Sequence, residues 1–548
     1  MELKIVIIGG VAGGMSAATR ARRMNEHASI IVLEKSGYVS FANCGLPYFI
    51  GGQIQNEESL FLTTPERVAK RYRIDARIHH EVTRIDRQTH LVEGTNHKTG
   101  EKFTLPYDKL ILAPGASPII PNVPGIDASN VFVLRNVEDA QKLQSYLSQV
   151  KPERAIVVGA GFIGLEMVEA LHSRGLKITV IEKAPYALPA LDAQMSGWIE
   201  QEMRQHGVEV RMGEGLAALE VENGRVRNLQ TDTGQNIPTD LLILAIGVRP
   251  LTKLAQTAGV NVGPIGGIVV DKALRTSDPD IYAVGDATEV TQGVADIAMR
   301  IPLAGAANRH GRLAGEHAAT GHAKSAAKLF GTAVVRVFGL DVAMTGLGYA
   351  SAKKLGYDAD TVLIHPNDHA GYYPGAQRMH FQLVYDRSNG KILGAQSIGG
   401  AGVDKRIDVV ATLLHFHGTI EDLAELDLCY APQFSGAKDP VHYAAFVAQN
   451  QQLGLSPGVD DPSNAAQLID VRSPQEFAQG SLEGAINIPL DDLRSRHREL
   501  DPDKSTIVYC ELGMRGHLAT RILKQIGFKD VQNLKGGYVQ VRQRVQVD

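Results

Sequence analysis

The chain has little cysteine, with only three residues in 548, at positions 44, 429 and 510. Cysteines spaced this widely do not predict a disulfide framework. The opening MELKIVIIGG enters a strand pattern at once, so we expect no signal peptide, and no apolar run approaches the length of a membrane span. These absences predict a cytoplasmic protein without a membrane span.

The chain also lacks an excess of basic residues. The formal net charge is -4, which offers no electrostatic footprint for nucleic acid. Hydrophobic residues at 44% and charged residues at 21% are typical of a soluble globular protein. A chain of 548 residues is too long for one hydrophobic core, so three or four domains are expected.

Glycines are plentiful near the amino terminus. LKIVIIGGVAGGMSAATRARRM joins a buried-strand pattern to a glycine cluster and then to a helical pattern. Glycines let the backbone approach a pyrophosphate, and the helix start adds N–H groups and a positive dipole. The next strand, SIIVLEK, ends in an acid placed to bind an adenosine ribose. The predicted dinucleotide site contains Gly9, Gly10, Ala12, Gly13, Gly14, Glu34 and Lys35.

The same pattern recurs in RAIVVGAGFIGLEMVEALHSRGLKITVIEK, so two dinucleotides are expected. Glu182 should accept a hydrogen bond from a free ribose 2′-hydroxyl and should repel a 2′-phosphate. This favours NADH and leaves NADPH possible. Glu166 is expected either to orient the nicotinamide or to be an ordinary surface glutamate. The second predicted site contains Gly159, Gly161, Phe162, Ile163, Gly164, Glu166, Glu182 and Gly247.

Three more segments lie between and after these two units, in a specific order: LILAPGASP, LLILAIGVRP and TSDPDIYAVGDATEV. With them the chain resembles the two-dinucleotide flavoprotein disulfide reductases, in which an NAD(P)H domain is inserted into an FAD domain. The resemblance implies an α/β protein with two Rossmann-like domains, for FAD and NADH, and an α+β dimerisation domain. It places Asp286 on the ribityl chain and extends the FAD site by Ala113, Gly115, Gly285, Asp286 and Pro302.

Cys44 lies in SFANCGLPY without a second cysteine nearby, so an internal dithiol is improbable. Its thiol must pair with a small-molecule sulfur or pass through a sulfenic acid. The segment is similar to the active-site segment of coenzyme A-disulfide reductases, which are relatives of single-cysteine NADH oxidases and peroxidases. That similarity implies a mixed disulfide or persulfide on Cys44 beside the flavin, and a helix starting at Gly45 would favour the thiolate.

The same resemblance implies a coenzyme A site. Its expected contacts are Ser16, Arg20, Arg23, Ser40, Asn43 and Lys438, and three further cofactor-binding residues are Arg71, Asn308 and Arg309. Cationic side chains suit the phosphates of this ligand. A solvated helix face remains the alternative for the arginines of RARR.

GYYPGA and CYAPQFSGAKDP resemble interface segments that reach the active site of a partner subunit. The resemblance implies a homodimer with a shared site, in which Tyr372 and Tyr430 bring phenols near the Cys44 sulfur, with Tyr373 as the fallback. Cys429 is expected to be a buried bystander, and a resolving thiol is the alternative.

The final part of the chain follows a polar stretch, QNQQLGLSPGVDDPSNAAQ, that has the composition of a linker. STIVYCELGMRGHLATRILKQIGF then predicts a strand that delivers Cys510 to the loop before a helix, where N–H groups and Arg515 should lower the thiol pKa. This part resembles a rhodanese domain, which implies sulfane-sulfur chemistry at Cys510 and a structural role for Asp470 and Arg472.

These patterns predict seven consecutive segments and no metal site. They are the FAD domain at 1–112, a connection within it at 113–150, the NAD(P)H domain at 151–275, the rest of the FAD domain at 276–325, the dimerisation domain at 326–448, a linker at 449–465 and the rhodanese domain at 466–548.

The predicted activity is an FAD-dependent NADH:persulfide or polysulfide reductase that binds coenzyme A and releases sulfide. Coenzyme A disulfide is the second possible substrate within the same class. An NADH oxidase or peroxidase that uses a Cys44 sulfenic acid also stays open, and so does a non-enzymatic redox sensor.

Overall fold

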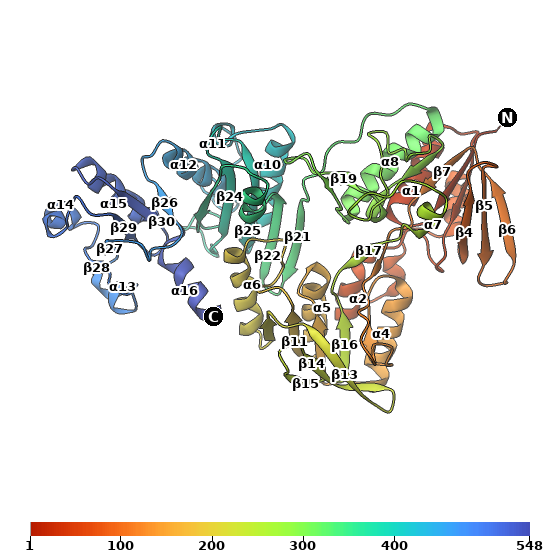
Figure 1. Cartoon of the computed structure of the whole chain (residues 1–548), viewed down its shortest axis with the longest axis horizontal. Helices are drawn as coiled ribbons and strands as arrows, with labels where there is room; N and C mark the ends of the chain where they lie inside the picture. Colours follow the sequence, from red (N-terminus) through yellow and green to blue (C-terminus); the bar gives the residue numbers. More distant parts are fainter. Residues whose placement is uncertain (1, 548) are drawn as a thin grey trace. The chain divides into compact units, whose positions relative to one another are not determined.

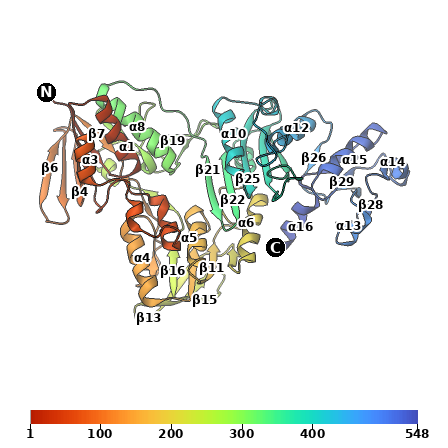
Figure 2. The same ribbon diagram turned by 180° about the vertical axis from the view of Figure 1, so that it is seen from behind.

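The computed structural model describes residues 2–547, which divide into two compact units. Unit 1 comprises Met1–Pro185 and Gly207–Gly331, and unit 2 comprises Tyr186–His206 and Thr332–Asp548. The chain colours of Figures 1 and 2 trace both units from opposite sides. None of the helices in 2–547 is long and apolar enough to cross a membrane.

The first sheet of unit 1 is parallel and has the strand order β18-β7-β1-β2-β3. Its strands are β1 (Lys4–Ile8), β2 (Ser29–Leu33), β3 (Asp75–Arg77), β7 (Lys109–Leu112) and β18 (Ile281–Ala283). The apolar runs of β1 and β7 are buried in its core, as continuous runs in a parallel sheet require.

Helices α1 (Ala12–Met24) and α8 (Ala304–Thr320) pack closely beside this sheet (Figure 1). A Cβ at Gly311 would lie 2.2 Å from the carbonyl oxygen of Gly13, so small residues set the separation of these helices. Unit 1 also contains the helices η1 (Asn43–Gly45), α2 (Leu46–Gly51), η2 (Glu57–Leu60), α3 (Pro65–Tyr72), α4 (Val137–Val150), α7 (Lys253–Thr257) and η3 (Gly285–Ala287).

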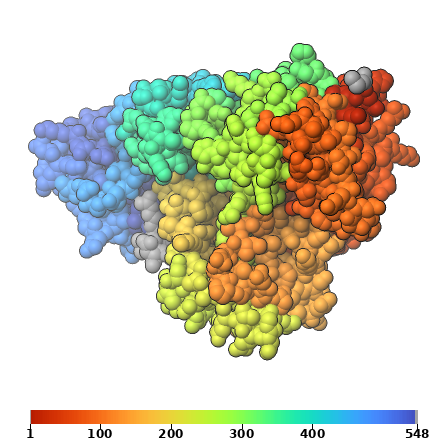
Figure 3. Space-filling model, turned by 45° about the vertical axis from the view of Figure 1, so that its right-hand side comes forward, coloured from red at the N-terminus to blue at the C-terminus, as the bar shows by residue number. Residues whose placement is uncertain are grey.

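A small antiparallel sheet joins the first sheet, formed by β4 (His80–Asp86), β5 (Leu91–Asn96) and β6 (Lys102–Pro106). Alternate residues of β6 are exposed, and the sheet belongs to the orange-red surface of Figure 3. Short strand pairs are formed by β8 (Ala116–Pro118) with β17 (Val248–Pro250), and by β19 (Val290–Thr291) with β20 (Ala298–Met299).

The second parallel sheet of unit 1 has the order β12-β11-β10-β16-β9. Its strands are β9 (Val131–Phe132), β10 (Arg154–Val158), β11 (Lys177–Glu182), β12 (Glu209–Met212) and β16 (Leu241–Leu244). Helix α5 (Phe162–His172) follows β10, and a side sheet is formed by β13 (Leu216–Glu222), β14 (Arg225–Thr231) and β15 (Asn236–Pro238). Unit 1 therefore contains the two Rossmann-like sheets that the glycine motifs predict.

Unit 2 begins with an antiparallel sheet of order β21-β22-β25-β24-β23. The strands are β21 (Ala333–Val337), β22 (Leu340–Gly346), β23 (Ala359–Ile364), β24 (His380–Asp386) and β25 (Ile392–Gly399). The accompanying helices are α6 (Ala193–Gln205), α9 (Tyr349–Lys354), α10 (Val403–His415), α11 (Ile420–Ala424) and α12 (Pro440–Gln452). This is the predicted α+β dimerisation domain, to which α6 is added from an earlier part of the chain.

The end of unit 2 is a parallel sheet of order β26-β30-β29-β27-β28. Its strands are β26 (Gly458–Val459), β27 (Gln467–Asp470), β28 (Ile486–Asn487), β29 (Thr506–Tyr509) and β30 (Val531–Leu534). Its helices are α13 (Pro474–Ala478), α14 (Leu493–Arg496), η4 (His497–Glu499), α15 (Met514–Gln525) and α16 (Gly537–Val547). The fold class expected from the sequence is thus confirmed, with two Rossmann-like sheets, an α+β domain and a last α/β module.

The last module of unit 2 packs directly on the antiparallel sheet. Lys535 Nζ lies 2.7 Å from Asp360 Oδ1 of β23 and 3.2 Å from Asp460 Oδ2, and its side chain is only 7% exposed. Helix α16 lies beside α6, where Gln540 Nε2 donates to the carbonyl oxygen of Gln194 at 3.0 Å. A nearly buried ammonium group with two carboxylate partners therefore fixes this junction.

Candidate functional site

The first glycine turn lies between β1 and α1 and admits no larger residues. Gly9 has φ +103°, and a Cβ there would lie 2.0 Å from the carbonyl oxygen of Ala113. Glu34 is buried at the end of β2, where its two carboxylate oxygens accept from the backbone N–H of Gly10 at 2.7 Å and of Ser36 at 2.8 Å. Within the described residues no side chain caps α1, so its first N–H groups suit a pyrophosphate.

The second turn repeats this geometry between β10 and α5. Gly159 has φ +105°, and a Cβ at Gly164 would lie 1.9 Å from the carbonyl oxygen of Gly159. Glu182 accepts from the N–H of Ala160 and of Ala184, both at 2.8 Å. Phe162 and Ile163 form the first turn of α5, and Gly247 has φ +112° after β16. Both predicted clusters come together, each as a cradle that fits a dinucleotide.

Asp286 lies in η3, directly after β18, next to an arginine that no sequence motif indicates. Its Oδ2 accepts from the Arg135 guanidinium at 2.8 Å, and Arg135 Nε donates to the carbonyl oxygen of Ala116 at 3.1 Å. Gly115 is close as well, since a Cβ there would lie 3.2 Å from that guanidinium. Arg135 immediately precedes the amino-terminal cap of α4, and its contact with Asp286 arises only from the fold.

Cys44 lies in η1, one turn before α2. The side chain is accessible to solvent, and its Sγ is 3.8 Å from Asn43 Oδ1. Partial desolvation raises the thiol pKa, the charges of Glu166 and Asp286 raise it further, and Arg135 lowers it. Burial and the two carboxylates act against the helix start at Gly45, whose expected preference for the thiolate stays a prediction.

The other residues predicted to bind coenzyme A or FAD in unit 1 fall into two groups. Ser16 Oγ donates to Asn308 Oδ1 at 2.5 Å, and the half-buried Arg20 forms an ion pair with Glu316 at 2.5 Å. Ser40 has an unusual φ of +50° and its N–H donates to the carbonyl oxygen of Gly10 at 2.8 Å. The exposed group is Arg23, Lys35, Arg71, Pro302 and Arg309.

In unit 2, Tyr372 and Tyr430 come together, because their hydroxyl oxygens are 2.9 Å apart. Tyr372 is 77% exposed and Tyr373 is 39% exposed, and the hydrogen bond from Tyr372 raises the Tyr430 pKa. Cys429 is exposed rather than buried, with Lys405 Nζ 4.0 Å from its Sγ. Lys438 is exposed on the same segment, before α12.

Cys510 follows β29 in a tight loop before α15. Its side chain is 2% exposed, and the backbone N–H of Gly513 donates to its Sγ at 3.1 Å. Arg515 forms a bidentate ion pair with Glu476 at 2.6 and 2.7 Å. The hydrogen bonds to Glu476, together with electrostatic attraction to Cys510, raise the Arg515 pKa. Glu476 is not among the residues predicted from the sequence, although the capping box that it forms with Ser473 is a local signal that could have found it.

The core beneath this loop contains a buried ion pair between Asp470 and Arg472, at 2.8 Å. Arg472 also bonds Glu511, the neighbour of Cys510, at 3.0 Å and lies 4.2 Å from the Tyr538 ring centroid. This arrangement agrees with the structural role expected for the pair.

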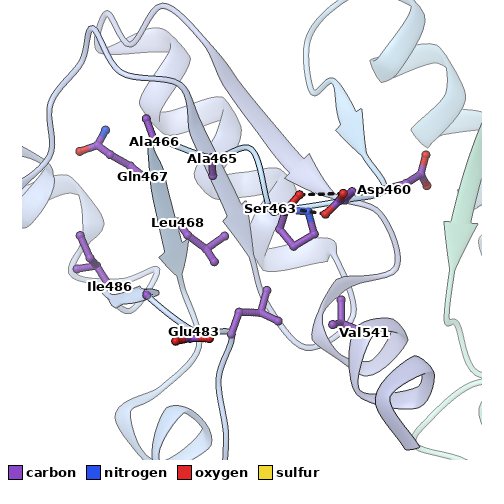
Figure 4. A pocket seen from close by; sticks show the side chains of 13 residues that line it. Asp460, Ser463, Ala465, Ala466, Gln467, Leu468, Glu483, Ile486 and Val541 are labelled. Carbon is purple, nitrogen blue, oxygen red and sulfur yellow. Dashed lines mark hydrogen bonds between the residues drawn. The ribbon is translucent and has the colours of Figure 1, made fainter. Parts of the chain in front are cut away.

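A separate cavity of about 490 Å³ lies between the linker, β27 and α16 (Figure 4). Asp460, Asp461 and Glu483 contribute carboxylates, and Leu468 and Val541 are among its apolar residues. None of the residues predicted for the sulfur sites lines this cavity.

Comparison with family models covers nearly the whole chain. Residues 3–311 match the pyridine nucleotide-disulphide oxidoreductase model, residues 332–440 match the dimerisation domain of that family, and residues 458–544 match the rhodanese-like domain.

The curated relatives include Coenzyme A disulfide reductase of Staphylococcus haemolyticus, 32% identical over 82% of this chain and 99% of the relative. The enzyme of the same name from Staphylococcus aureus is 33% identical over 81% of this chain and 100% of the relative.

Among solved structures, reduced Bacillus anthracis CoADR-RHD has 43% identity and a TM-score of 0.96, covering 100% of this chain and 99% of that one. A NAD-dependent persulfide reductase from A. fulgidus has 37% identity and a TM-score of 0.93, covering 98% and 100%.

Proposed function

The chain belongs to the pyridine nucleotide-disulphide oxidoreductase family, and we propose that it is an NADH-dependent reductase of persulfides and polysulfides, with coenzyme A persulfide as the leading substrate. It is a flavin-dependent oxidoreductase that acts on a sulfur group, and its family implies FAD and NAD(P)H. The observation that carries the proposal is the presence of two separate cysteine sites: solvent-accessible Cys44 and, in a rhodanese loop, Cys510.

The two glycine cradles have distinct tasks in this proposal. The turn at Gly9–Gly14 would hold FAD together with Glu34 and Asp286, and the turn at Gly159–Gly164 would hold NADH. Once bound, FAD would take a hydride from NADH and supply an electron pair to the sulfur centre. The Glu182 carboxylate, anchored by two N–H groups, supports NADH over NADPH because it would repel a 2′-phosphate.

Cys44 carries the sulfur step. Its thiolate attacks the outer sulfur of R–S–SH, which forms Cys44–S–SH and releases R–S⁻, and that thiolate takes up a proton to become R–SH. Two electrons and one proton then cleave the Cys44–S–SH bond and give back the Cys44 thiolate with H₂S. The sum is R–S–SH + NADH + H⁺ → R–SH + H₂S + NAD⁺.

The dimerisation domain indicates a homodimer, and we place Tyr372 and Tyr430 of a second protomer at the Cys44 site. Their paired hydroxyl groups suit proton donation to the leaving R–S⁻. For the coenzyme A phosphates we propose the exposed cations Arg23, Arg71, Arg309 and Lys438. Arg20 is committed to Glu316 and would need to exchange partners to take part.

Reduction of coenzyme A disulfide is the second candidate. Relatives with that name favour this activity. The alignment covers 99% or more of each relative but only 81–82% of this chain. The rhodanese module is additional to that alignment, which supports sulfane sulfur as the feature particular to this chain. We expect the activity in the cytoplasm, where NADH and coenzyme A are present.

The test is anaerobic NADH oxidation by the FAD-loaded protein, with released sulfide counted. Substrates are coenzyme A persulfide, polysulfide and coenzyme A disulfide, and the variants are Cys44→Ser and Cys510→Ser, with Cys429→Ser as the matched control. We expect rapid persulfide turnover that depends on Cys44, and polysulfide use that also depends on Cys510. Turnover of the disulfide alone, indifferent to Cys510, would contradict the proposal.

A further inference from the structure

Asn533 is a polar residue of β30, the strand beside the one that delivers Cys510. The two strands pair in parallel, with Asn533 opposite Val508, two residues before the cysteine. Val508 belongs to the core cluster that also contains Ala519 of α15. Because successive residues of a strand face opposite sides of the sheet, Asn533 lies on the side of α15 and Gln532 on the other side.

The Asn533 side chain bonds the residue that donates to the Cys510 sulfur. Its Nδ2 donates to the carbonyl oxygen of Gly513 at 3.1 Å, and the N–H of Gly513 donates to Cys510 Sγ at 3.1 Å. Gly513 has φ +96°, a conformation that glycine adopts readily and other residues rarely do. Both polar groups of this flexible residue are therefore engaged, one by the thiol and the other by Asn533.

A second glycine makes room for the Asn533 amide. A Cβ at Gly516, in the first turn of α15, would lie only 2.2 Å from Asn533 Oδ1. That oxygen is buried and accepts no hydrogen bond from the residues that the structure describes. The hydrogen-bonding contact that the amide makes within residues 2–547 is the one to Gly513.

This bond attaches the start of α15 to the sheet. The carbonyl oxygen of Gly513 also accepts from the N–H of His517 at 2.9 Å, at the beginning of the helix. Asn533 therefore joins the helix start, and with it the Gly513 N–H, to the strand beside Cys510. On the other side of the loop, the N–H of Tyr538 donates to the carbonyl oxygen of Cys510 at 2.8 Å. The cysteine and the donor to its sulfur are thus each attached to the module by a separate bond.

We propose that Asn533 is a positioning residue that holds the Gly513 N–H on the Cys510 sulfur and thereby favours the anionic form of this sulfur. A hydrogen bond to the charged form of a group stabilises that form, and a Gly513 that is free to turn would withdraw its donor. The same donor would face a persulfide anion on Cys510. The relevance of this contact to sulfur transfer rests on the proposed function.

The test measures the thiol itself and needs no sulfur donor. In the FAD-loaded full chain, the rate of alkylation of Cys510 by iodoacetamide is followed from pH 5 to 10, and peptide-resolved mass spectrometry separates it from the exposed Cys44 and Cys429. A shift between variants reports the loop, because the charged and titratable groups around it stay the same, namely Arg472, Glu476, Glu511, Arg515, His517 and Arg542. Sulfur transfer from thiosulfate to cyanide is measured separately.

We expect Asn533→Ala to move the alkylation profile to higher pH by about 1 unit, which slows the reaction roughly tenfold wherever the rate rises with pH. Sulfur transfer should fall by a similar factor. Gly516→Ala should move the profile in the same direction, because its methyl group would displace the Asn533 amide. Gln532→Ala is the matched control: it removes an amide of the same strand that bonds the exposed Asp530, and the profile should stay unchanged.

A role limited to packing predicts the opposite result. A loosened loop would expose the buried Cys510 and speed its alkylation at every pH, without moving the profile. That result overturns the proposal, and so does an Asn533→Ala profile that superimposes on that of the unmodified chain. If Asn533→Ala fails to fold, the profile of Gly516→Ala decides in the same way. A shift as expected, in a chain that transfers no sulfur, would support the positioning role and contradict the proposed function of Cys510.

Discussion

Cys44 and Cys510 are surrounded by the protein in opposite ways. Cys44 lies open in a short helical turn among carboxylates, and desolvation with these charges raises its thiol pKa. Cys510 is buried in a loop between a strand and a helix, with an N–H group on its sulfur and a clamped arginine nearby. The groups that surround Cys510 all belong to one module, whereas those that act on Cys44 come from several segments of unit 1.

This contrast suggests a division of tasks. A thiol that ionises reluctantly is protected from side reactions until cofactor and substrate arrive. If Cys510 carries sulfane sulfur as proposed, the Gly513 N–H and the start of α15 are placed to stabilise its persulfide anion. The independence of the two sites can be tested one variant at a time, beginning with the largest expected effect.

Cys44→Ser should abolish the reaction at Cys44 and leave the reaction at Cys510 intact. We expect NADH-linked reduction of coenzyme A persulfide to fall by at least about 1,000-fold, because serine cannot form the mixed persulfide. Sulfur transfer from thiosulfate to cyanide through Cys510 should remain unchanged in the same variant. The measurement is both rates on one preparation, and a joint loss would show that the sites are not independent.

Arg515→Ala should have the converse effect. Removing the cation beside Cys510 breaks the bidentate contact with Glu476, and we expect sulfur transfer to fall roughly 10- to 100-fold. Reduction of preformed coenzyme A persulfide should be retained. Arg496→Ala is the control, since that arginine forms an exposed pair with Glu499 in the same module. Equal losses in both variants would argue against a specific role for Arg515.

Lys535→Met tests whether the Cys510 module depends on its neighbour. The variant leaves Asp360 without its cation at a nearly buried junction, and we expect a loss of about 2 kcal/mol in the free energy of unfolding of unit 2. Denaturant unfolding measures this loss of free energy. Lys529→Met is the control, because Lys529 pairs with Asp503 on the exposed surface. An unchanged midpoint would mean that the junction adds little stability.

The sequence was a good guide wherever neighbouring residues determine the geometry. The turns at Gly9 and Gly159 and the acids Glu34 and Glu182 follow from strand, glycine and helix patterns within about 25 residues. Contacts between distant segments were not predictable in this way. Arg135 meets Asp286 across 151 positions and Arg20 meets Glu316 across 296, so neither partner leaves a local signature.

The smallest effect concerns acid stability at the Cys510 site. The Arg515 hydrogen bonds lower the Glu476 pKa to about 2, so the folded state binds this proton less readily than the unfolded chain. The stabilisation is therefore fully present above the ordinary glutamate pKa of about 4.3 and is lost as pH falls toward 2. Because the pair is partly exposed, the contribution is screened by water and salt.

Glu476→Gln should remove this dependence. Its unfolding midpoint should lie below that of the unmodified chain at pH 7, and the two midpoints should converge between pH 4 and 2. Thermal melts of the FAD-loaded protein across this range provide the measurement, with Glu499→Gln as an exposed control. A gap that persists at pH 2 would mean that Glu476 stabilises the loop through its capping box with Ser473 rather than through Arg515.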